Sequence, residues 1–562
     1  MVPRETTSEH TEVPSGGRSG RRTGRIPTWL PASRPADARR LAPLSLAVVL
    51  VPASLALMRF LIGLHRPFAH AGDAAILETA IRRVATGTQA LGPYSRFGFH
   101  QPGPAYFFLQ APFSWLTGGS PRSLFIGALV INLGAAAACI AVVRRQFGEP
   151  AARWSAVVIA GYLLAVSPAL LADPWNPYVL GTPLLLTILL AARAAAGSWS
   201  AAAGAAVVGT FVVQTHLGTA VTLLALFGVT AVIAVAGRQR RTCDRSAHPA
   251  SGHRRWAVVG AAAVLLGAFW IPPVVEQVTH SPGNATLIAR FFRESHPEFD
   301  AAVDHSLGTA ATQVAAHLAT LPLGRPFDEP ADPGGTERDA TRTALALAGI
   351  VAGGVVAVLG WRRRHLFVAT LGGLSIVGST TAIWSTTQIV GEAHPYLLVW
   401  TGSLLLPAWM AIGLVGRRLT DTLRWRQLLT VTLLVVGTTL TWSMVRAPLP
   451  PVGGNPDVAA ATAMTRPWLR VQGGPVRVRI GQHDLWPVAV GLVNELDRHG
   501  VDVTVDEQWA ALFGDQFAPT NRERSELWLT APTAPAPAAA AQRLGTAAGA
   551  SLWGRLTSPS TR

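Results

Sequence analysis

The chain has 562 residues, of which 49% are hydrophobic and only 14% are charged. Soluble chains carry about 25% charged residues, so the composition excludes an ordinary soluble protein. The net charge of +16 would suit a nucleic-acid-binding protein. However, the arginines stand at the ends of apolar runs, as the positive-inside rule describes, so we expect no nucleic-acid partner.

Polar residues rich in Gly, Ser, Pro and Arg make up 1–40, which predicts a disordered cytoplasmic segment. Between residues 41 and 446 the chain alternates between polar loops and apolar runs, most of them long enough to cross a hydrocarbon core of about 30 Å. We therefore predict an α-helical polytopic membrane protein. Its eleven expected spans are 41–64, 122–143, 153–172, 178–195, 199–213, 217–236, 256–272, 341–360, 366–385, 395–416 and 427–446.

Arginine-rich loops set the predicted orientation. Placing these loops in the cytoplasm puts 65–121, 273–340 and everything after residue 446 outside, with the N-terminus inside. The chain is then a multi-pass protein of the plasma membrane, surrounded by its lipids. The loops placed inside are 144–153, 237–255, 361–365 and 416–426.

One further apolar run, 104–118, must not span the membrane if this orientation holds. The run is short, rich in aromatic residues, and interrupted by Pro104 and Pro112. We therefore predict a helix that lies in the outer interface.

The last segment, 447–562, differs in kind because it balances ten acids against ten arginines. VRVRIGQ, VDVTVDEQ and ELWLTAP read as strands, and LWPVAVGLVNELDRHG reads as an amphipathic helix. PTAPAPAAAA reads as a low-complexity loop. This order predicts a small extracytoplasmic α/β domain.

Asp73 follows the first span closely and precedes a helical segment, AAILETAIRRVATG. Two roles are open for it: an N-cap that accepts hydrogen bonds from first-turn amides, or a catalytic acid at the membrane surface. Glu78 has two open roles as well. It is either a surface partner of Arg82, four residues on, or a substrate contact.

A cluster of polar and aromatic residues follows Asp73 in the same loop. Such residues at the headgroup level can form an interfacial belt. They are also what a lipid-linked phosphate site requires, with cationic donors for the phosphate and aromatic faces for a sugar. The substrate-binding candidates in this cluster are Tyr94, Arg96, His100, Gln101 and Tyr106.

Four more candidates lie at other predicted outer positions. Asn176 sits in a proline-flanked turn, where turn chemistry is the alternative role. His216 lies at the junction of two spans, where a histidine faces protein or a water-filled cavity. Glu276 comes just after a span, and His394 belongs to the GEAHPY stretch.

Several of these stretches resemble the GT-C superfamily of membrane glycosyltransferases, which includes the protein O-mannosyltransferases and the aminoarabinose transferases. The matching stretches are GDAAILE (72–78), HQPGPAYFFLQAPFSWLTG (100–118), WNPY (175–178) and QTHLG (214–218). GPYSRFG and the His-Pro-Gly-Pro-like stretch after it are most similar to uncharacterised actinobacterial members. The resemblance covers about residues 41–280.

The resemblance implies that a sugar moves from a polyprenyl-phosphate donor to a lipid, glycan or protein acceptor on the outer face. Asp73 would be the general base, and Arg and His side chains would stabilise the leaving phosphate. Many relatives carry a second acid beside the first, whereas Ala74 and Ala75 follow Asp73 here. Glu78 lies about 140° away around the helix. We therefore predict no metal ligands and leave a divalent cation open as a cofactor.

The alternative function is that of a transporter or flippase of lipid-linked saccharides. Such proteins usually contain repeated halves with broken helices at the bilayer midplane. The sequence shows no internal repeat, and its polar motifs gather on one face. A non-catalytic scaffold for the C-terminal domain is a third reading, and it leaves the cluster in the first outer loop unexplained.

The predicted orientation can be tested with reporter fusions. We expect a reporter placed after residue 120 to lie outside, one after residue 250 inside, and one after residue 450 outside. A pattern with all three sides exchanged would mean that 104–118 crosses the membrane.

Overall fold

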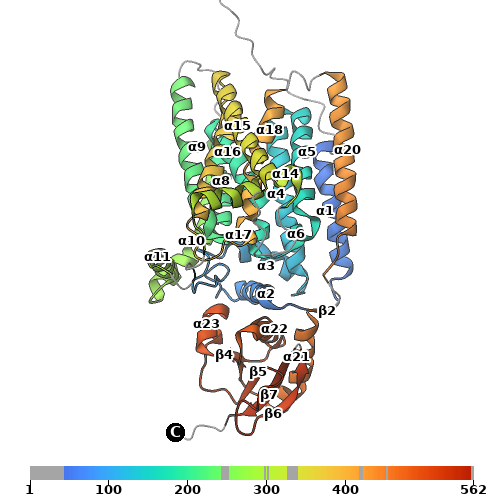
Figure 1. Ribbon diagram of the computed structural model, residues 1–562, viewed down its shortest axis with the longest axis vertical. Helices are drawn as coiled ribbons and strands as arrows, with labels where there is room; N and C mark the ends of the chain where they lie inside the picture. Colours follow the sequence, from blue (N-terminus) through green and yellow to red (C-terminus); the bar gives the residue numbers. More distant parts are fainter. Residues whose placement is uncertain are drawn as a thin grey trace, which may run out of the picture. The chain divides into compact units, whose positions relative to one another are not determined.

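A computed structural model describes residues 43–241, 252–296, 299, 303–325, 339–416, 422–450, 453–547 and 549–557. The predicted disordered segment 1–40 lies outside these residues, as does the middle of the arginine-rich loop 237–255. The described chain forms a helical bundle and, beyond α2, a smaller region built on a sheet (Figure 1).

Nine stretches among the described residues are long and apolar enough to cross a membrane. The chain is therefore a multi-pass membrane protein. The long helices in these stretches are α1 (Leu44–Ile62), α4 (Ser123–Phe147), α7 (Gly181–Ala195), α9 (Ala220–Arg241), α10 (Gly252–Thr279), α15 (Ala340–Arg362), α16 (Leu366–Thr386), α18 (Leu406–Val415) and α20 (Leu423–Arg446). Short helical turns extend three of them: η1 (Asn176–Val179), η2 (Leu217–Thr219), and α17 (Pro395–Leu398) with η3 (Val399–Ser403).

Two of the eleven predicted spans are not among these nine. The predicted 153–172 falls on α5 (Glu149–Val166), and 199–213 falls on α8 (Trp199–Thr215). Both helices run within the bundle beside the others (Figure 1). Inside a bilayer only such hydrogen-bonded helices satisfy the backbone, which is why the apolar runs all become helical.

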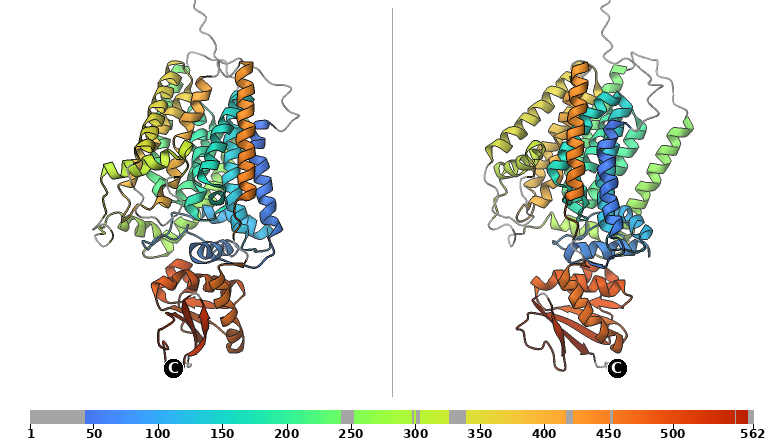
Figure 2. Two further views of the ribbon diagram at one scale, coloured as in Figure 1. Left: turned by 45° about the vertical axis from the view of Figure 1, so that its right-hand side comes forward. Right: turned by 90° about the vertical axis from the view of Figure 1, so that its right-hand side faces the viewer.

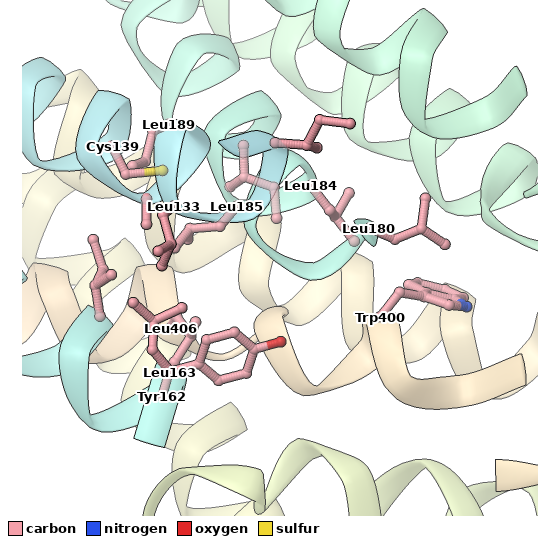
Figure 3. Close-up of a cluster of buried hydrophobic side chains, with 14 of the residues drawn as sticks. Leu133, Cys139, Tyr162, Leu163, Leu180, Leu184, Leu185, Leu189, Trp400 and Leu406 are labelled. Carbon is pink, nitrogen blue, oxygen red and sulfur yellow. The ribbon is translucent and has the colours of Figure 1, made fainter. Parts of the chain in front are cut away.

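The core of the bundle is built from interdigitating aliphatic side chains. Figure 3 shows Leu133 of α4, Leu163 of α5, Leu185 of α7 and Leu406 of α18 within one buried cluster. All four are fully or nearly fully buried. Each of these helices contributes buried side chains to this cluster, so their close packing determines which faces of the helices meet.

Small residues bring α15 and α16 close together. A Cβ atom on Gly372 would collide with the backbone carbonyl of Gly353 on the facing helix. Such close backbone approach is the usual way in which membrane helices associate, because lipid supplies no hydrophobic driving force between them.

Two of the loops predicted to share one side of the membrane, 144–153 and 361–365, lie at the same end of the bundle. Glu149 pairs with Arg144 and Arg153 there, and it accepts hydrogen bonds from Ser45 at the start of α1. His365, in the turn between α15 and α16, stacks on Phe147 at the end of α4.

The opposite end of the bundle, here called the domain-bearing end, has α2 (Gly72–Val84) and α3 (Ala105–Leu116) beside it (Figure 1). The predicted interfacial run 104–118 forms α3. Its 12 residues are too few to span a bilayer. α2 lies between the bundle and the C-terminal region in all three views (Figure 1 and Figure 2).

The C-terminal region contains a five-stranded sheet in the order β4-β3-β5-β7-β6. β3 pairs in parallel with β4 and β5, whereas β7 is antiparallel to β5 and β6. The predicted strand–helix–strand order is confirmed, but α21 and the β6–β7 hairpin were not predicted. The elements are α21 (Pro456–Gln472), β3 (Val476–Ile480), η4 (His483–Leu485), α22 (Trp486–Arg498), β4 (Val503–Val505), α23 (Glu507–Phe513), η5 (Asp515–Phe517), β5 (Ser525–Thr530), β6 (Gln542–Ala547) and β7 (Ala550–Leu556).

The α2 helix belongs to two hydrophobic cores at once. Ala75 and Ile76 pack into the core of the C-terminal region. Leu77, Ala80 and Ile81 pack into the core of the membrane bundle. The helix is therefore held from two sides.

A buried polar network joins α2 to α22. Arg82 donates to Glu78 at 2.9 Å, to the Asn494 side chain at 2.9 Å and to Asp497 at 2.6 Å. The Asn494 amide donates to Glu78 at 2.9 Å, and the Thr79 hydroxyl donates to the Asn494 oxygen at 2.8 Å. Of the two roles expected for Glu78, the structure shows the ion pair with Arg82.

Two short strands join the start of α2 to the start of the C-terminal region. β1 (Phe68–Ala69) pairs in parallel with β2 (Gly453–Gly454). The backbone amide of Asn455 donates to the carbonyl of Ala69 at 2.8 Å. The segments that follow α1 and α20 are thus tied to each other directly.

We predict that Asn494→Ala will destabilise the fold. The substitution removes the hydrogen bonds that Asn494 makes with Glu78, Thr79 and Arg82. Each lost hydrogen bond costs about 0.5–1.5 kcal/mol. Tryptophan fluorescence of detergent-solubilised protein should show a lower unfolding temperature. Gln508→Ala, at an exposed position on α23, is the control. Equal unfolding temperatures for the two variants would contradict a stabilising role for the network.

Candidate active site

Asp73 is the second residue of α2, within its first turn. The N-cap position belongs to Ala71, and no side chain caps the helix, so the N-cap role considered for Asp73 is wrong. Asp73 is exposed to solvent in part. Desolvation by the surrounding protein raises the pKa of Asp73, and a hydrogen bond from the Trp175 side chain opposes that rise. The carboxylate is therefore available to a ligand and poised to take up a proton.

Aromatic rings line the surroundings of Asp73. Trp175 lies 4.5 Å from Tyr396 and 5.4 Å from Tyr178, measured between ring centroids. The His394 ring stacks on Tyr396 at 5.6 Å. The charge of Asp73 acts on Tyr396 as well. These rings come from two distant chain segments and present flat apolar faces beside one carboxylate.

Arg96 supplies the positive charge in the same neighbourhood. Its guanidinium lies 4.8 Å from the Phe97 ring centroid, and it acts electrostatically on Tyr396. One of its terminal nitrogens lies close to Gly391. The side chain is exposed, and within the described residues no carboxylate forms an ion pair with it. The arrangement leaves Arg96 able to bind an anion.

The QTHLG stretch holds these segments together. Thr215 accepts a hydrogen bond at 2.9 Å from the side-chain amide of Asn176, through its backbone carbonyl. The ring of His216 bonds to the backbone of Leu397, next to Tyr396. Asn176 and His216, both predicted as substrate contacts, therefore hold Trp175 and Tyr396 in place.

The HQPGPAY stretch contacts the QTHLG and WNPY stretches as well. The Gln101 side chain accepts a hydrogen bond at 2.6 Å from the backbone amide of Leu217. Tyr106 is fully buried, and its hydroxyl donates to the carbonyl of Pro174. Gln101 and Tyr106 thus support the site through these hydrogen bonds.

Tyr94 and His100 form a second group. Their rings meet edge to face at 5.2 Å, and their backbones form an antiparallel bridge. Burial, with a smaller effect of Arg83, lowers the pKa of His100 to about 4. The imidazole is therefore neutral at physiological pH, and it offers a hydrogen bond where the sequence suggested a cation.

Asn284 fixes the backbone of His100. Its side chain accepts from the His100 amide at 2.7 Å and donates to the His100 carbonyl at 3.0 Å. Glu276 in turn accepts from the Asn284 amide at 3.1 Å and 3.2 Å. Glu276, predicted as a substrate contact, therefore acts on the loop that holds His100.

A cavity of about 270 Å³ opens beside this site at the domain-bearing end. Its lining is mostly apolar and comes from the ends of α1, α4, α6 (Pro168–Ala172) and α20. The polar groups on it are Arg59 and Asp173. Asp173 accepts a hydrogen bond from the Trp175 amide at 2.8 Å, so the cavity wall is continuous with the aromatic surroundings of Asp73.

The two acids of α2 point to different partners, as their helical spacing predicted. Glu78 is engaged with Arg82 and Asn494, and Asp73 lies near Trp175. In the part of the chain that the structure describes, no group of three or more His, Cys, Asp or Glu side chains is placed to hold a metal ion.

No protein-family profile and no curated protein matches this chain. Among solved structures it is similar to ArnT from Cupriavidus metallidurans bound to undecaprenyl phosphate, with a TM-score of 0.51 and 14% identity over 90% of this chain and 97% of that one. ArnT of the same organism in the apo state matches with a TM-score of 0.48 and 12% identity, over 90% and 97% of the two chains.

The chain has a fold like that of the ArnT structure bound to undecaprenyl phosphate. The fold class expected from the sequence is thereby confirmed, with its polytopic membrane region and small C-terminal sheet region. The similarity to actinobacterial members stays a prediction.

Two residues near Asp73 were not among the predicted site residues. Trp175 stands in the WNPY stretch, where Asn176 was the predicted substrate contact, and Tyr396 ends the GEAHPY stretch beside His394. An aromatic residue next to proline at the end of a span was the available signal. The hydrogen bond between Trp175 and Asp73 joins positions about a hundred residues apart, so no local pattern contains it.

Proposed function

We propose that this protein is a membrane glycosyltransferase that moves a sugar from a polyprenyl-phosphate donor to an acceptor. The observation that carries the proposal is the meeting of four distant motifs around Asp73, on a fold like that of ArnT and at the end of a membrane bundle. The carboxylate caps no helix, is partly desolvated, and stands beside aromatic rings and Arg96.

In this proposal Asp73 is the general base. It takes the proton of the acceptor hydroxyl while the acceptor oxygen forms a bond to the anomeric carbon. The bond between that carbon and the phosphate oxygen breaks, and its electron pair leaves with the phosphate. Direct displacement of this kind inverts the anomeric carbon.

Arg96 and the aromatic rings have complementary roles. The Arg96 guanidinium stabilises the negative charge that develops on the departing phosphate. Trp175 and Tyr396 offer the flat faces on which a sugar ring packs. His394 extends this surface through its stacking on Tyr396.

The cavity beside Asp173 suits the lipid part of the donor. It is lined mainly by Ala, Phe, Leu, Met and Pro side chains, and it lies at the ends of spanning helices. ArnT, whose fold this chain shares, was solved with undecaprenyl phosphate bound. We infer a lipid-linked donor of the same chemical class for this protein.

The transporter alternative is less well supported. A transporter places its polar groups near the bilayer midplane, on broken helices. Asp73, Arg96 and Trp175 stand instead outside the stretches that can span the membrane. We also propose that the domain-bearing end faces outward in the plasma membrane, with the N-terminus in the cytoplasm, as the arginine-rich loops predict.

Asp73→Asn should reduce sugar transfer by roughly a hundredfold to ten-thousandfold, the usual effect of removing a general base. The assay follows transfer of label from a panel of polyprenyl-phosphate sugars in membranes that contain the protein. Asp457→Asn is a matched control, because Asp457 also stands in the first turn of its helix. Transfer at the wild-type rate by Asp73→Asn would remove this residue from the mechanism.

The rate should also depend on pH through Asp73. Desolvation raises the pKa of Asp73, and a base works only when deprotonated. The value of kcat/KM should therefore fall as pH decreases through this raised pKa, at a higher pH than the value of about 4 that is usual for aspartate.

In Trp175→Phe the fall of kcat/KM at low pH should occur at still higher pH. The reason is that this variant loses the hydrogen bond that lowers the pKa of Asp73. Trp384→Phe, at an exposed position on α16, should leave the profile unchanged. A fall that moves to lower pH in Trp175→Phe would contradict the assignment of Asp73 as the base.

A further inference from the structure

Arg122 is a buried cation outside the candidate active site. It stands directly before α4, in the connection that follows α3, and is only 3% exposed. Its guanidinium packs against the turn that ends α1. The residue thus lies at the boundary of two membrane spans.

The guanidinium of Arg122 lacks hydrogen-bond acceptors. Its Nε and Nη2 atoms are buried and have no hydrogen-bond partner. An arginine side chain stays protonated in proteins and offers five donors. Burying a charge without a partner is costly, so an unpaired buried guanidinium points to an anion that binds there.

Two neighbours stabilise the charge without accepting these hydrogen bonds. The guanidinium lies 4.9 Å from the Phe68 ring centroid, a cation–π distance. Nη1 lies beside Gly63, at the C-terminal end of the α1 dipole. Neither neighbour reaches Nε or Nη2, so both donors still need an acceptor.

A second cation stands close by. Burial and, to a smaller extent, the nearby Arg66 lower the pKa of Arg122. Arg66 is exposed, and neither arginine is ion-paired to a carboxylate in the part of the chain described here. The region therefore has an uncompensated positive charge, which a bound anion would balance.

The surroundings place this charge at the depth of lipid headgroups. Leu61 and Ile62 end α1 with exposed side chains, 47% and 75% exposed. Trp115 and Leu116 end α3 and are 57% and 84% exposed. Apolar side chains thus border the cationic group and offer a surface for acyl chains, since α1 itself is apolar enough to span.

We propose that Arg122 and Arg66 bind the phosphate group of an anionic membrane lipid. The phosphate oxygens accept from the Nε and Nη2 edge of Arg122, which fits the bidentate geometry of guanidinium and phosphate. The acyl chains lie along the exposed end of α1. This site does not depend on the proposed glycosyltransferase function.

The test uses the full-length protein in detergent micelles, titrated with short-chain phosphatidylglycerol and, separately, with short-chain phosphatidylcholine. Native mass spectrometry counts bound lipid and gives a Kd for each. We expect phosphatidylglycerol to bind more tightly than phosphatidylcholine. Arg122→Met should raise the Kd for phosphatidylglycerol by roughly tenfold or more, the effect of one lost charge-assisted hydrogen bond.

Arg446→Met is the matched control. Arg446 ends α20, is exposed, and stacks on the Trp442 ring at 4.1 Å, so it shares the cation–π contact but has no buried unpaired donor. Its lipid affinity should equal that of the wild type. If Arg122→Met does not fold, Arg66→Met tests the same site, because Arg66 is exposed. This variant should also bind phosphatidylglycerol more weakly than the wild type.

Several outcomes would overturn the proposal. One is equal affinity of the wild type for the two lipids, and another is undiminished phosphatidylglycerol binding in Arg122→Met and Arg66→Met. Arg122→Lys keeps the charge but loses the planar fork, so its affinity should lie between those of the wild type and Arg122→Met. Inorganic phosphate that binds as tightly as phosphatidylglycerol would identify a free anion as the ligand and contradict a lipid site.

Discussion

The position of α2 between two hydrophobic cores is the constraint on which the candidate site depends. A helix packed on one side only can rotate or slide to relieve strain. α2 cannot, because Ala75 and Ile76 are fixed by one core and Leu77, Ala80 and Ile81 by the other. The carboxylate at its first turn thereby acquires a defined place relative to Trp175 and Tyr396. The energy that holds this place comes from burial and from the Asn494 network, and neither involves a substrate.

Hydropathy and charge were sufficient to predict the membrane region, because a bilayer leaves the chain so few choices. A helix at 104–118 that is too short to span the membrane could be predicted from the length of the run and its prolines. In the C-terminal region, period-two alternation predicted β3 and β5. The β6–β7 hairpin escaped prediction because QRLGTA and ASLWGRL lack a regular alternation, and their pairing follows from contacts with β5 that are distant in sequence.

Local spacing also predicted part of the site. The four-residue step from Glu78 to Arg82 gives the ion pair that the structure contains. It does not reveal Asn494, which completes the network from more than 400 residues away. In the same way, Gln101, Tyr106, Asn176 and His216 were found by residue type and location. Their supporting role follows from hydrogen bonds between segments that only the fold brings together.

The pairing of β1 with β2 has a consequence for how the protein is made. One side of α2 is covered by residues after Pro456, which are synthesised after the membrane bundle. Until then Glu78 and Arg82 lack Asn494, and one apolar face of α2 has no cover. The helix that carries Asp73 therefore reaches its final environment only after the membrane bundle has been synthesised, when the two glycines of β2 pair with the strand that directly follows the first span.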